Sequence, residues 1–221
     1  MLTISVSSEF SERVPQFRGA FLEATVQNSA TSPKLWAEIE ASCEKLQADF
    51  TTETIKSRSS IAATRAAYKA CGKDPSRYRP ASEQLSRRVL QGKGLYSVDT
   101  LVDLGNLVSI FSGYPTGLLD ADKIVGESVE LGIGRADEPY EGIGRGTLNI
   151  EGLPVYRDAV GAIASPTSDS TRTMLSPTTS RLLFIINGYD GDEQLLQESI
   201  DLAQDLLQRY AHADEARIVK F

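Results

Sequence analysis

The sequence contains few of the side chains on which common metal sites and hydrolytic sites depend. Among its 221 residues there are one histidine and two cysteines. His212, Cys43 and Cys71 have no spacing typical of a zinc site, so we expect no bound metal and no other cofactor. A Ser–His–Asp triad would have only His212 to use, and this histidine follows the last amphipathic helical turn. Conventional nucleophilic hydrolysis is therefore poorly supported.

Long apolar segments are also missing. The longest apolar run, around 182–186, is far too short to span a bilayer. The N-terminus lacks the basic start and long apolar stretch of a signal peptide. Two cysteines give no disulfide framework and suit a reducing compartment. We therefore expect a cytoplasmic protein with no membrane partner.

The chain is nevertheless long enough to bury a sizeable core, with 41% hydrophobic residues. Apolar residues at helical spacing, with caps and glycine stops, predict helices in the first half and at the end, over 32–50, 51–72, 80–91, 97–113 and 192–210. Short β-like runs alternate with glycine-rich turns between 123 and 187, and further strands are expected at 2–6, 17–26 and 217–221. This segregation predicts an α+β fold, and no linker divides it, so we expect one compact domain over residues 1–221.

Charge is distributed unevenly along the chain. The net charge is −7, yet residues 56–93 carry ten basic side chains against two acidic ones, Asp74 and Glu83. This segment therefore has a net charge of +8 and the remainder −15. Clustered Lys and Arg favour a polyanionic partner, because they release counterions from phosphates. The alternative is a solvated basic helix face that acids elsewhere balance.

Residues 164–179 form a hydroxyl-rich stretch before an apolar strand. Nine of its sixteen residues are Ser or Thr, with one acid, Asp169, and one base, Arg172. Arg172 could clamp a carboxylate or phosphate in bidentate fashion, while Asp169 could hold Arg172 or accept an α-amino group. The alternative is an Asp–Arg pair that fixes a long loop, with hydroxyls capping its turns. We favour a binding element, because long ordered loops more often bind than link.

Two other patterns concern polar positions. GIGRGT (142–147) resembles a phosphate-binding loop, but it lacks the P-loop lysine and the strand–loop–helix setting, so we predict a plain hairpin turn. Asp99, Asp103 and Asn106 fall at helical spacing and are expected to share one polar stripe of the 97–113 helix.

A longer string of features resembles a known family. RPASEQLSRRVLQGKGLYSVDTLVDLGNLVSIFSGYPTGLLDADKI (79–124) contains a basic pair, a Val-Asp-Leu-Gly-Asn helix segment, a Gly-Tyr-Pro turn, and an Asp before Lys-Ile. GAIASPTSDSTRTMLSPTTSRLLFIINGYDG (161–191) completes the string. Together, over about residues 55–190, they resemble the editing domain of the phenylalanyl-tRNA synthetase beta subunit, the B3/4 domain, in its stand-alone form.

The resemblance implies an α+β domain around a pocket that admits the aminoacyl end of a mischarged tRNA and hydrolyses the ester. Asn106, Pro115 and Gly161 match positions that line or shape the family's pocket, and Ala162 follows the last of these. Three polar pocket groups of the synthetase are replaced: its histidine corresponds to Gly117, its threonine to Gly105, and its glutamate falls near Ile185. Glycines at 105 and 117 predict a roomier pocket.

On this basis we expect a pocket between the helix of Asn106, the 115–117 turn, residues 161–162, and the loop of Asp169 and Arg172. We expect phosphate contacts from four basic residues, namely Arg79, Arg87, Arg88 and Lys93. The resemblance implies a domain that binds tRNA or aminoacyl-tRNA and hydrolyses mischarged aminoacyl esters in trans, without a covalent nucleophile. A non-catalytic RNA-binding module and a small-molecule aminoacyl or amino-acid binder remain as alternatives.

Overall fold

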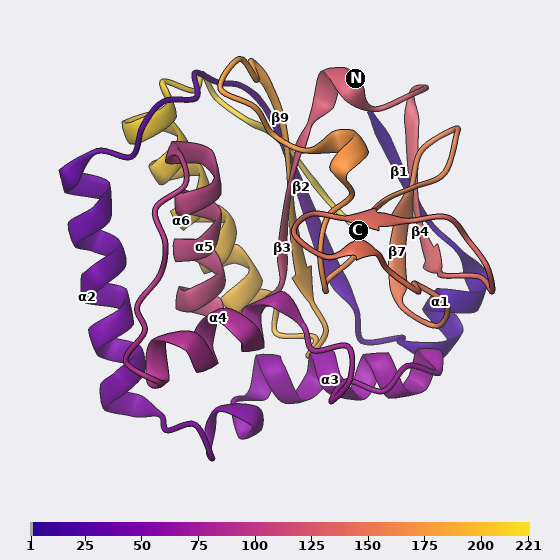
Figure 1. The fold of residues 1–221 in the computed structure, drawn as a ribbon. Helices are drawn as coiled ribbons and strands as arrows, with labels where there is room; N and C mark the ends of the chain where they lie inside the picture. The colour runs from indigo at the N-terminus through magenta and orange to yellow at the C-terminus, as the bar shows by residue number, and fades with distance from the viewer. Residues whose placement is uncertain (1) are drawn as a thin grey trace.

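The chain folds into an α+β unit in which a group of helices and two sheets are stacked side by side (Figure 1). The computed structural model describes residues 2–221. The helices are α1 (Ser8–Arg13), α2 (Pro33–Asp49), α3 (Ser59–Cys71), α4 (Ala81–Leu90), α5 (Thr100–Ser112) and α6 (Glu193–Ala211). The strands are β1 (Thr3–Val6), β2 (Arg18–Thr25), β3 (Thr116–Asp120), β4 (Ser128–Ile133), β5 (Glu141–Gly142), β6 (Gly146–Thr147), β7 (Pro154–Arg157), β8 (Ala162–Ala164), β9 (Arg181–Gly188) and β10 (Arg217–Lys220). The expected α+β class is confirmed.

The two main sheets differ in the direction of their strands. The central sheet has the order β10-β2-β9-β3 and is antiparallel throughout. The second has the order β1-β4-β7-β8, with β1 parallel to β4 and the other pairs antiparallel. β5 and β6 form a small separate hairpin, so the plain turn expected for GIGRGT is confirmed.

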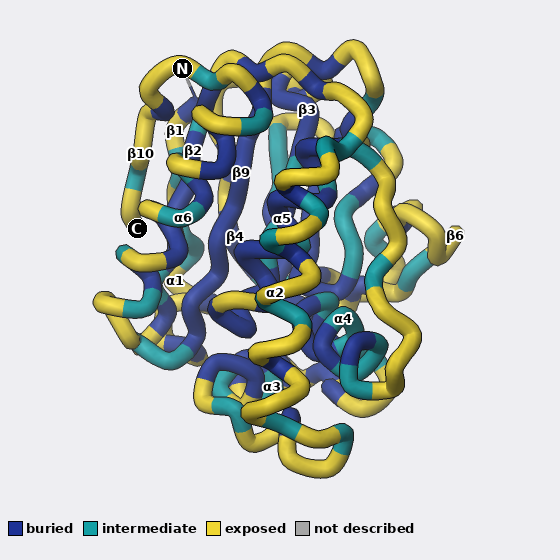
Figure 2. Tube along the Cα trace, turned by 90° about the vertical axis from the view of Figure 1, so that its left-hand side faces the viewer, coloured by how far each residue is buried: buried dark blue, intermediate teal, exposed yellow. Residues whose placement is uncertain are grey.

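Strand β9 lies at the centre of the fold and is buried on both faces, which explains its uninterrupted apolar sequence. Leu182, Phe184 and Ile186 belong to a core cluster shared with α2, α5 and α6. Leu183 and Ile185, which point to the opposite face, pack with side chains of the second sheet. Residues 182–188 of β9 are buried and this strand is dark blue in Figure 2, whereas outward-facing turns of α2 and α3 are exposed. The central sheet thus separates two hydrophobic cores.

Most helix ends follow from local sequence signals. Ser32 caps α2 by accepting a hydrogen bond from the Leu35 N–H, and Pro33 occupies its first turn. Asp99 caps α5 by accepting from the Val102 N–H. Gly113 ends α5 in the left-handed conformation (φ 76°), where a side chain would also collide with Ser60.

The helix expected over 51–72 is interrupted. A 3₁₀ turn at 55–57 precedes α3, and Arg58 between them is extended, with φ −56° and ψ 128°. The Arg58 guanidinium donates hydrogen bonds to the carbonyls of Ile110 and Phe111. These are carbonyls of the last turn of α5, so a tertiary contact breaks the helix at a position that local propensity would have continued.

Two further elements differ from the sequence-based expectation. Helix α1 and strand β3 were not predicted, because both are short and have weak periodicity. The cap of α6 is Asp192, whose side chain accepts from the Leu195 N–H, while the neighbouring Asp190 has another role. Asp190 instead accepts a hydrogen bond from the Tyr114 hydroxyl at 2.6 Å.

Across residues 2–221 every helix is too short or too polar to cross a bilayer.

Candidate functional site

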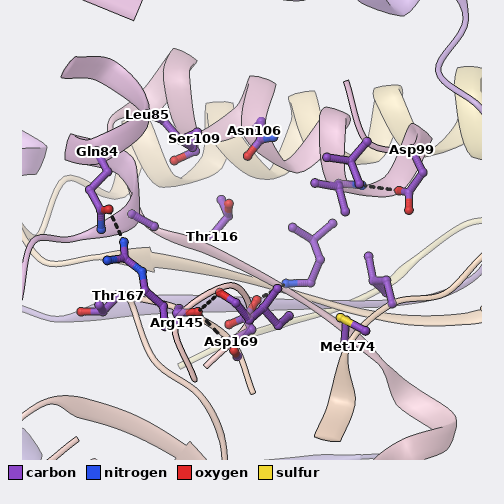
Figure 3. Close-up of a pocket in the computed structure, with 17 residues that line it drawn as sticks. Gln84, Leu85, Asp99, Asn106, Ser109, Thr116, Arg145, Thr167, Asp169 and Met174 are labelled. Atoms are coloured by element: carbon purple, nitrogen blue, oxygen red, sulfur yellow. Dashed lines mark hydrogen bonds between the residues drawn. The ribbon is translucent and has the colours of Figure 1, made fainter. Parts of the chain in front are cut away.

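A cavity of about 440 Å³ lies where α4, α5, β3 and the β5–β6 hairpin meet the hydroxyl-rich loop. Figure 3 shows Asn106 and Ser109 on one wall and Asp169 on the opposite wall. The wall of α5 is positioned by the Asp99 cap, and the loop is positioned by a bridge between Gly142 and Ser170. The cavity therefore brings together segments about 90 residues apart in sequence, from Ala81 to Leu175.

Apolar side chains form much of this cavity. Leu85, Val102, Leu118 and Leu175 line it, together with three side chains that are well exposed. These three are Val98 (64% exposed), Met174 (42%) and Ile143 (38%). A concave apolar surface with a few polar groups is typical of small-ligand sites. The cavity can therefore accommodate an apolar group of a ligand.

Asp169 places a carboxyl group in this apolar setting. The Leu118 N–H donates to Asp169 Oδ2 at 3.1 Å, and the other oxygen, Oδ1, has no hydrogen-bond partner within residues 2–221. The residue lies deep in the molecule yet touches the cavity, so it is half-buried by surface area. Burial raises the pKa of Asp169 to about 7, and the Leu118 hydrogen bond opposes this rise only in part. Near neutral pH the group is therefore available as both acid and carboxylate.

Glycines at two matched positions bring the walls of the cavity together. A Cβ atom at Gly117 would lie 3.2 Å from Asp169 Oδ1, so this glycine leaves the space that the carboxyl group occupies. A Cβ atom at Gly105 would lie 2.2 Å from Leu118 Cδ1, so α5 and β3 approach closely there. Leu118 and Asp169 thus occupy the space beside these two glycines, and a pocket roomier than that of the synthetase stays a prediction.

Some of the other polar groups that line the cavity already make hydrogen bonds within the protein, and others do not. Ser109 Oγ donates to the Tyr114 carbonyl at 2.8 Å, and Thr167 Oγ1 bonds the Tyr68 hydroxyl at 2.9 Å. Thr116 Oγ1 donates to the Gly105 carbonyl at 3.2 Å. The Asn106 side chain makes no hydrogen bond to any described residue and is half-buried at the wall. Asn106 therefore has both its amide donors and its carbonyl oxygen free for a ligand.

Arg145 supplies the positive charge of the cavity. It lies on the turn of the β5–β6 hairpin, is exposed, and donates a hydrogen bond to Gln84 Oε1 of α4 (Figure 3). It forms no ion pair with the described residues. An arginine held by a neutral amide keeps its full charge for an anionic group. Sequence reasoning missed Arg145, because only the fold carries the hairpin to the cavity.

Comparison with known families identifies the family that the sequence resembles. A family model described as the B3/4 domain matches residues 63–213, well over half of the chain. The chain belongs to the B3/4 domain family. This domain is found in the phenylalanyl-tRNA synthetase beta subunit. A search of curated proteins finds no significant match.

Several positions expected in the pocket lie elsewhere in this B3/4 domain. Asn106 and Asp169 line the cavity, as does Thr116, which lies between Pro115 and Gly117. The Pro115 carbonyl accepts a hydrogen bond from Asn187 Nδ2 at 3.0 Å. Gly161 and Ala162 lie at β8, where Ala162 is buried in a separate core cluster. Neither they nor Pro115 and Gly117 are among the lining residues.

The expected pairing of Asp169 with Arg172 is not formed. Arg172 instead makes a bidentate pair with Asp158, with both N···O distances 2.8 Å. Burial acts to raise the pKa of Asp158, but hydrogen bonds from Arg172, Val125 and Val160 outweigh it and lower that pKa. Arg172 is not among the cavity-lining residues. The pair therefore anchors the loop to the β7–β8 turn, because Asp158 provides the nearer and fully buried carboxylate.

The polar stripe expected on α5 is only partly present. Asp99 and Asn106 line the cavity, whereas Asp103 is 1% exposed and points away from it. The Asp103 carboxylate accepts hydrogen bonds from Thr31 Oγ1 (2.5 Å), Ser97 Oγ (2.8 Å) and the Val98 N–H. It thus fixes the segment before α5 and is unavailable to a ligand.

Two of the four basic residues expected to contact phosphate are engaged by a buried acid. Glu83 is fully buried on α4 and receives Arg87 Nε at 2.8 Å and Arg65 Nη1 at 2.8 Å. Arg79 Nε lies 3.6 Å from the same carboxylate. Arg87 Nη1 also donates to the Thr52 carbonyl. Three basic side chains of the 56–93 segment therefore surround the negative charge of one buried carboxylate.

Arg88 and Lys93 have no such partner. Neither forms an ion pair within the described part of the chain, and Lys93 is exposed. Arg88 lies on the last turn of α4, with its guanidinium carbon 3.8 Å from the centre of the Tyr96 ring. These two side chains keep their charge for a partner outside the chain.

Proposed function

We propose that this B3/4 domain binds aminoacyl-tRNA, or a related aminoacyl conjugate, and hydrolyses the aminoacyl ester in trans. The observation that carries the proposal is the pair of uncommitted polar groups, Asp169 Oδ1 and the Asn106 amide, within a mainly apolar cavity. An aminoacyl ester has complementary chemistry, because it combines a cationic amine, a polar ester and a side chain.

The cavity has room for an aminoacyl group. Its volume of about 440 Å³ lies within the range of roughly 300–1,000 Å³ that is usual for small-ligand pockets. Leu85, Val102 and Leu118 would contact an apolar side chain, and removing that chain from water favours binding. The walls therefore favour an apolar aminoacyl group over a charged one.

Asp169 is the group best suited to the chemistry. In its ionised form it can accept a proton from a water molecule as that water attacks the ester carbonyl carbon. The bond between this carbon and the ribose oxygen then breaks, and the proton passes to the departing oxygen. This route needs no histidine or cysteine nucleophile. A carboxyl group with a pKa of about 7 is well matched to proton transfer near neutral pH.

Asn106 is suited to holding the substrate during this step. Its amide N–H groups can donate to the ester carbonyl oxygen, which gains negative charge as water attacks. Because the side chain has no protein partner within residues 2–221, binding the substrate breaks no existing hydrogen bond. Asn106 and Asp169 lie on opposite walls, so a substrate between them can contact both (Figure 3).

The nucleic-acid part of the proposal rests on the position of α4. Ala81, Gln84 and Leu85 of this helix line the cavity, while Arg88 of the same helix and Lys93 beyond it keep free positive charges. An RNA that follows these charges runs beside the cavity. Arg145 offers a further contact for a phosphate or carboxylate.

The test is a panel of mischarged aminoacyl-tRNAs incubated with the purified protein, with deacylation measured for wild type, Asp169→Asn and Asn106→Ala. We expect turnover of at least one apolar aminoacyl-tRNA, and a loss of roughly 100-fold or more in Asp169→Asn. The matched control is Asp122→Asn, an exposed carboxylate paired with Arg181 outside the cavity, which should keep full activity.

Two results would contradict the proposal. Binding of tRNA without turnover of any substrate would show a non-catalytic RNA-binding module. Binding of free amino acids without any affinity for tRNA would show a small-molecule binder.

A further inference from the structure

Tyr96 is the most exposed of the large apolar side chains that the structure describes. Its relative exposure is 72%, next to 64% for Val98 and Val160. It lies in the segment between α4 and α5, which has no regular secondary structure. Removing such a ring from water would be favourable, yet residues 2–221 leave it open. Tyr96 and Val98, two residues apart, thus both expose large side chains in this segment.

One face of the Tyr96 ring is covered by a cation. The Arg88 guanidinium carbon lies 3.8 Å from the ring centre, and Arg88 Nη2 donates to the Lys93 carbonyl at 3.4 Å. Arg88 Nε is buried and has no hydrogen-bond partner among the described residues, so the contact of the guanidinium with the ring face is its main local interaction. Arg88 therefore fixes the ring from one side, and the high exposure of Tyr96 places its open face toward solvent.

The ring also lies close to the cavity. Tyr96 precedes Val98 by two residues, and Val98 lines the cavity. Two residues of extended chain span at most about 7 Å, so the Cα atom of Tyr96 lies within that distance of the Cα atom of Val98. An RNA strand that enters the cavity beside Val98 can therefore reach the ring.

The charges around Tyr96 favour an RNA strand that runs toward the cavity. Arg88 and Lys93 have no acidic partner among the described residues, so they attract phosphates. On the other side of the 92–95 segment, Glu40 and Glu44 of α2 line a separate hollow. A phosphate chain is repelled from α2 and attracted toward α4.

We propose that the open face of Tyr96 is a stacking site for a nucleobase of unpaired RNA, next to the nucleotide whose aminoacyl end enters the cavity. This inference rests on the proposed function, because it gives the RNA of that proposal a specific contact. The base stacks on the ring face opposite Arg88, and Lys93 contacts an adjacent phosphate. Because every base has a π face, the site tolerates any base and selects for an unpaired strand.

The experiment measures RNA affinity without any hydrolysis. The probe is an uncharged RNA hairpin with four unpaired nucleotides at its 3′ end, labelled for fluorescence anisotropy and compared with the same hairpin with a blunt end. Tyr96→Leu keeps an apolar side chain of similar size but removes the π face, and Tyr96→Trp keeps it. The matched control is Tyr210→Leu, since the Arg209 guanidinium carbon lies 4.8 Å from the centre of the Tyr210 ring on α6, but the Tyr210 hydroxyl donates to Glu38 of α2.

We expect Tyr96→Leu to bind the overhang hairpin roughly 5- to 150-fold more weakly than wild type, the range for loss of one base–aromatic stack. Tyr96→Trp should bind at least as well as wild type, and Tyr210→Leu should be unchanged. Affinity for the blunt hairpin should be the same in wild type and Tyr96→Leu.

The outcomes separate this inference from the proposed function. If wild type binds the overhang hairpin and Tyr96→Leu binds it equally well, the stacking site is overturned, while the proposed function stands. If wild type binds neither hairpin, the stacking site is overturned, and the deacylation panel alone decides the proposed function. If Tyr96→Leu weakens both hairpins equally, the ring contacts RNA in some other way and the stacking site is likewise overturned.

Discussion

Glu83 of α4 and Asp169 of the hydroxyl-rich loop are two carboxyl groups that lie deep in the same protein, and they have opposite surroundings. Glu83 is completely buried and is met by Arg65, Arg79 and Arg87. Asp169 forms no ion pair with any of residues 2–221 and accepts one backbone hydrogen bond, from Leu118. A buried charge that is fully compensated fixes structure, whereas one left uncompensated is available for a ligand or a reaction. The comparison separates a carboxyl group that fixes structure from one that is available for a ligand.

The largest effect should follow from removing the compensated group. Glu83→Ala leaves three arginines around an empty buried position and should lower the free energy of unfolding by roughly 3–5 kcal/mol. For a chain of this size that corresponds to a fall of roughly 6–20 °C in melting temperature. Thermal and urea unfolding measure the change, with Glu44→Ala on the exposed side of α2 as control. A loss below about 1 kcal/mol would mean that the arginines do not depend on Glu83.

Asp169→Asn should have the opposite effect on stability, and the effect should depend on pH. The unfolded carboxyl loses its proton near pH 4, while the folded one keeps it until about pH 7. Between these values the folded state binds more protons, so wild type loses stability relative to the variant as pH rises, by at most about 1.4 kcal/mol per pH unit. Above pH 7 the difference is constant. Urea unfolding of both proteins from pH 4 to pH 8 measures it, and parallel curves would contradict the raised pKa.

Arg172→Ala tests whether an arginine in the polar loop is structural. Removing it leaves Asp158 buried, with only hydrogen bonds from backbone N–H groups such as those of Val125 and Val160, so we expect a loss of roughly 1–3 kcal/mol in stability. Activity per folded molecule should be retained, because Arg172 does not line the cavity. Thermal unfolding and deacylation are measured on the same sample. A variant that is as stable as wild type but inactive would show that Arg172 belongs to the binding site.

Arg145→Ala should weaken substrate binding and leave stability nearly unchanged, which is the reverse of the result expected for Arg172→Ala. The side chain is exposed and bound to Gln84 alone, so stability should change by less than about 0.5 kcal/mol. Loss of one charged contact should raise the KM for aminoacyl-tRNA roughly tenfold. Arg145→Lys should restore part of the affinity, because it keeps the charge but not the fork of donors. An unchanged KM in Arg145→Ala would exclude this residue from the site.

The smallest effect concerns the basic residues of α4. Arg88→Ala should reduce the slope of log affinity for tRNA against log salt by about one, since each lost phosphate contact releases one counterion fewer. Arg87→Ala should leave that slope nearly unchanged and lower stability instead, because Arg87 is bound to Glu83. Titrations at several salt concentrations measure both. Equal slopes for the two variants would show that Glu83 does not sequester Arg87.

Much of the fold could be predicted because its signals are local. Ser32 with Pro33, the apolar periodicity of 97–113, and glycine after α3 and α5 act within one or two helical turns. The break at Arg58 could not be predicted, because its cause is a contact with Ile110, 52 residues away. The complete set of cavity-lining residues could not be predicted either, because it too depends on long-range contacts. Asn106 and Asp169 were identified by resemblance and composition, but Arg145 reaches them only through the fold.

The sequence by itself determined the family, the α+β class and the polar residues available to a site, because these depend on residue type, order and short-range spacing. The tertiary structure decided which charges remain free. Asp158 forms an ion pair with Arg172, and Glu83 forms one with Arg87. The absence of a side chain at Gly117 leaves space for the Asp169 carboxyl group. Ion pairing and burial depend on distances of a few ångströms between segments far apart in sequence, and only the folded chain sets those distances.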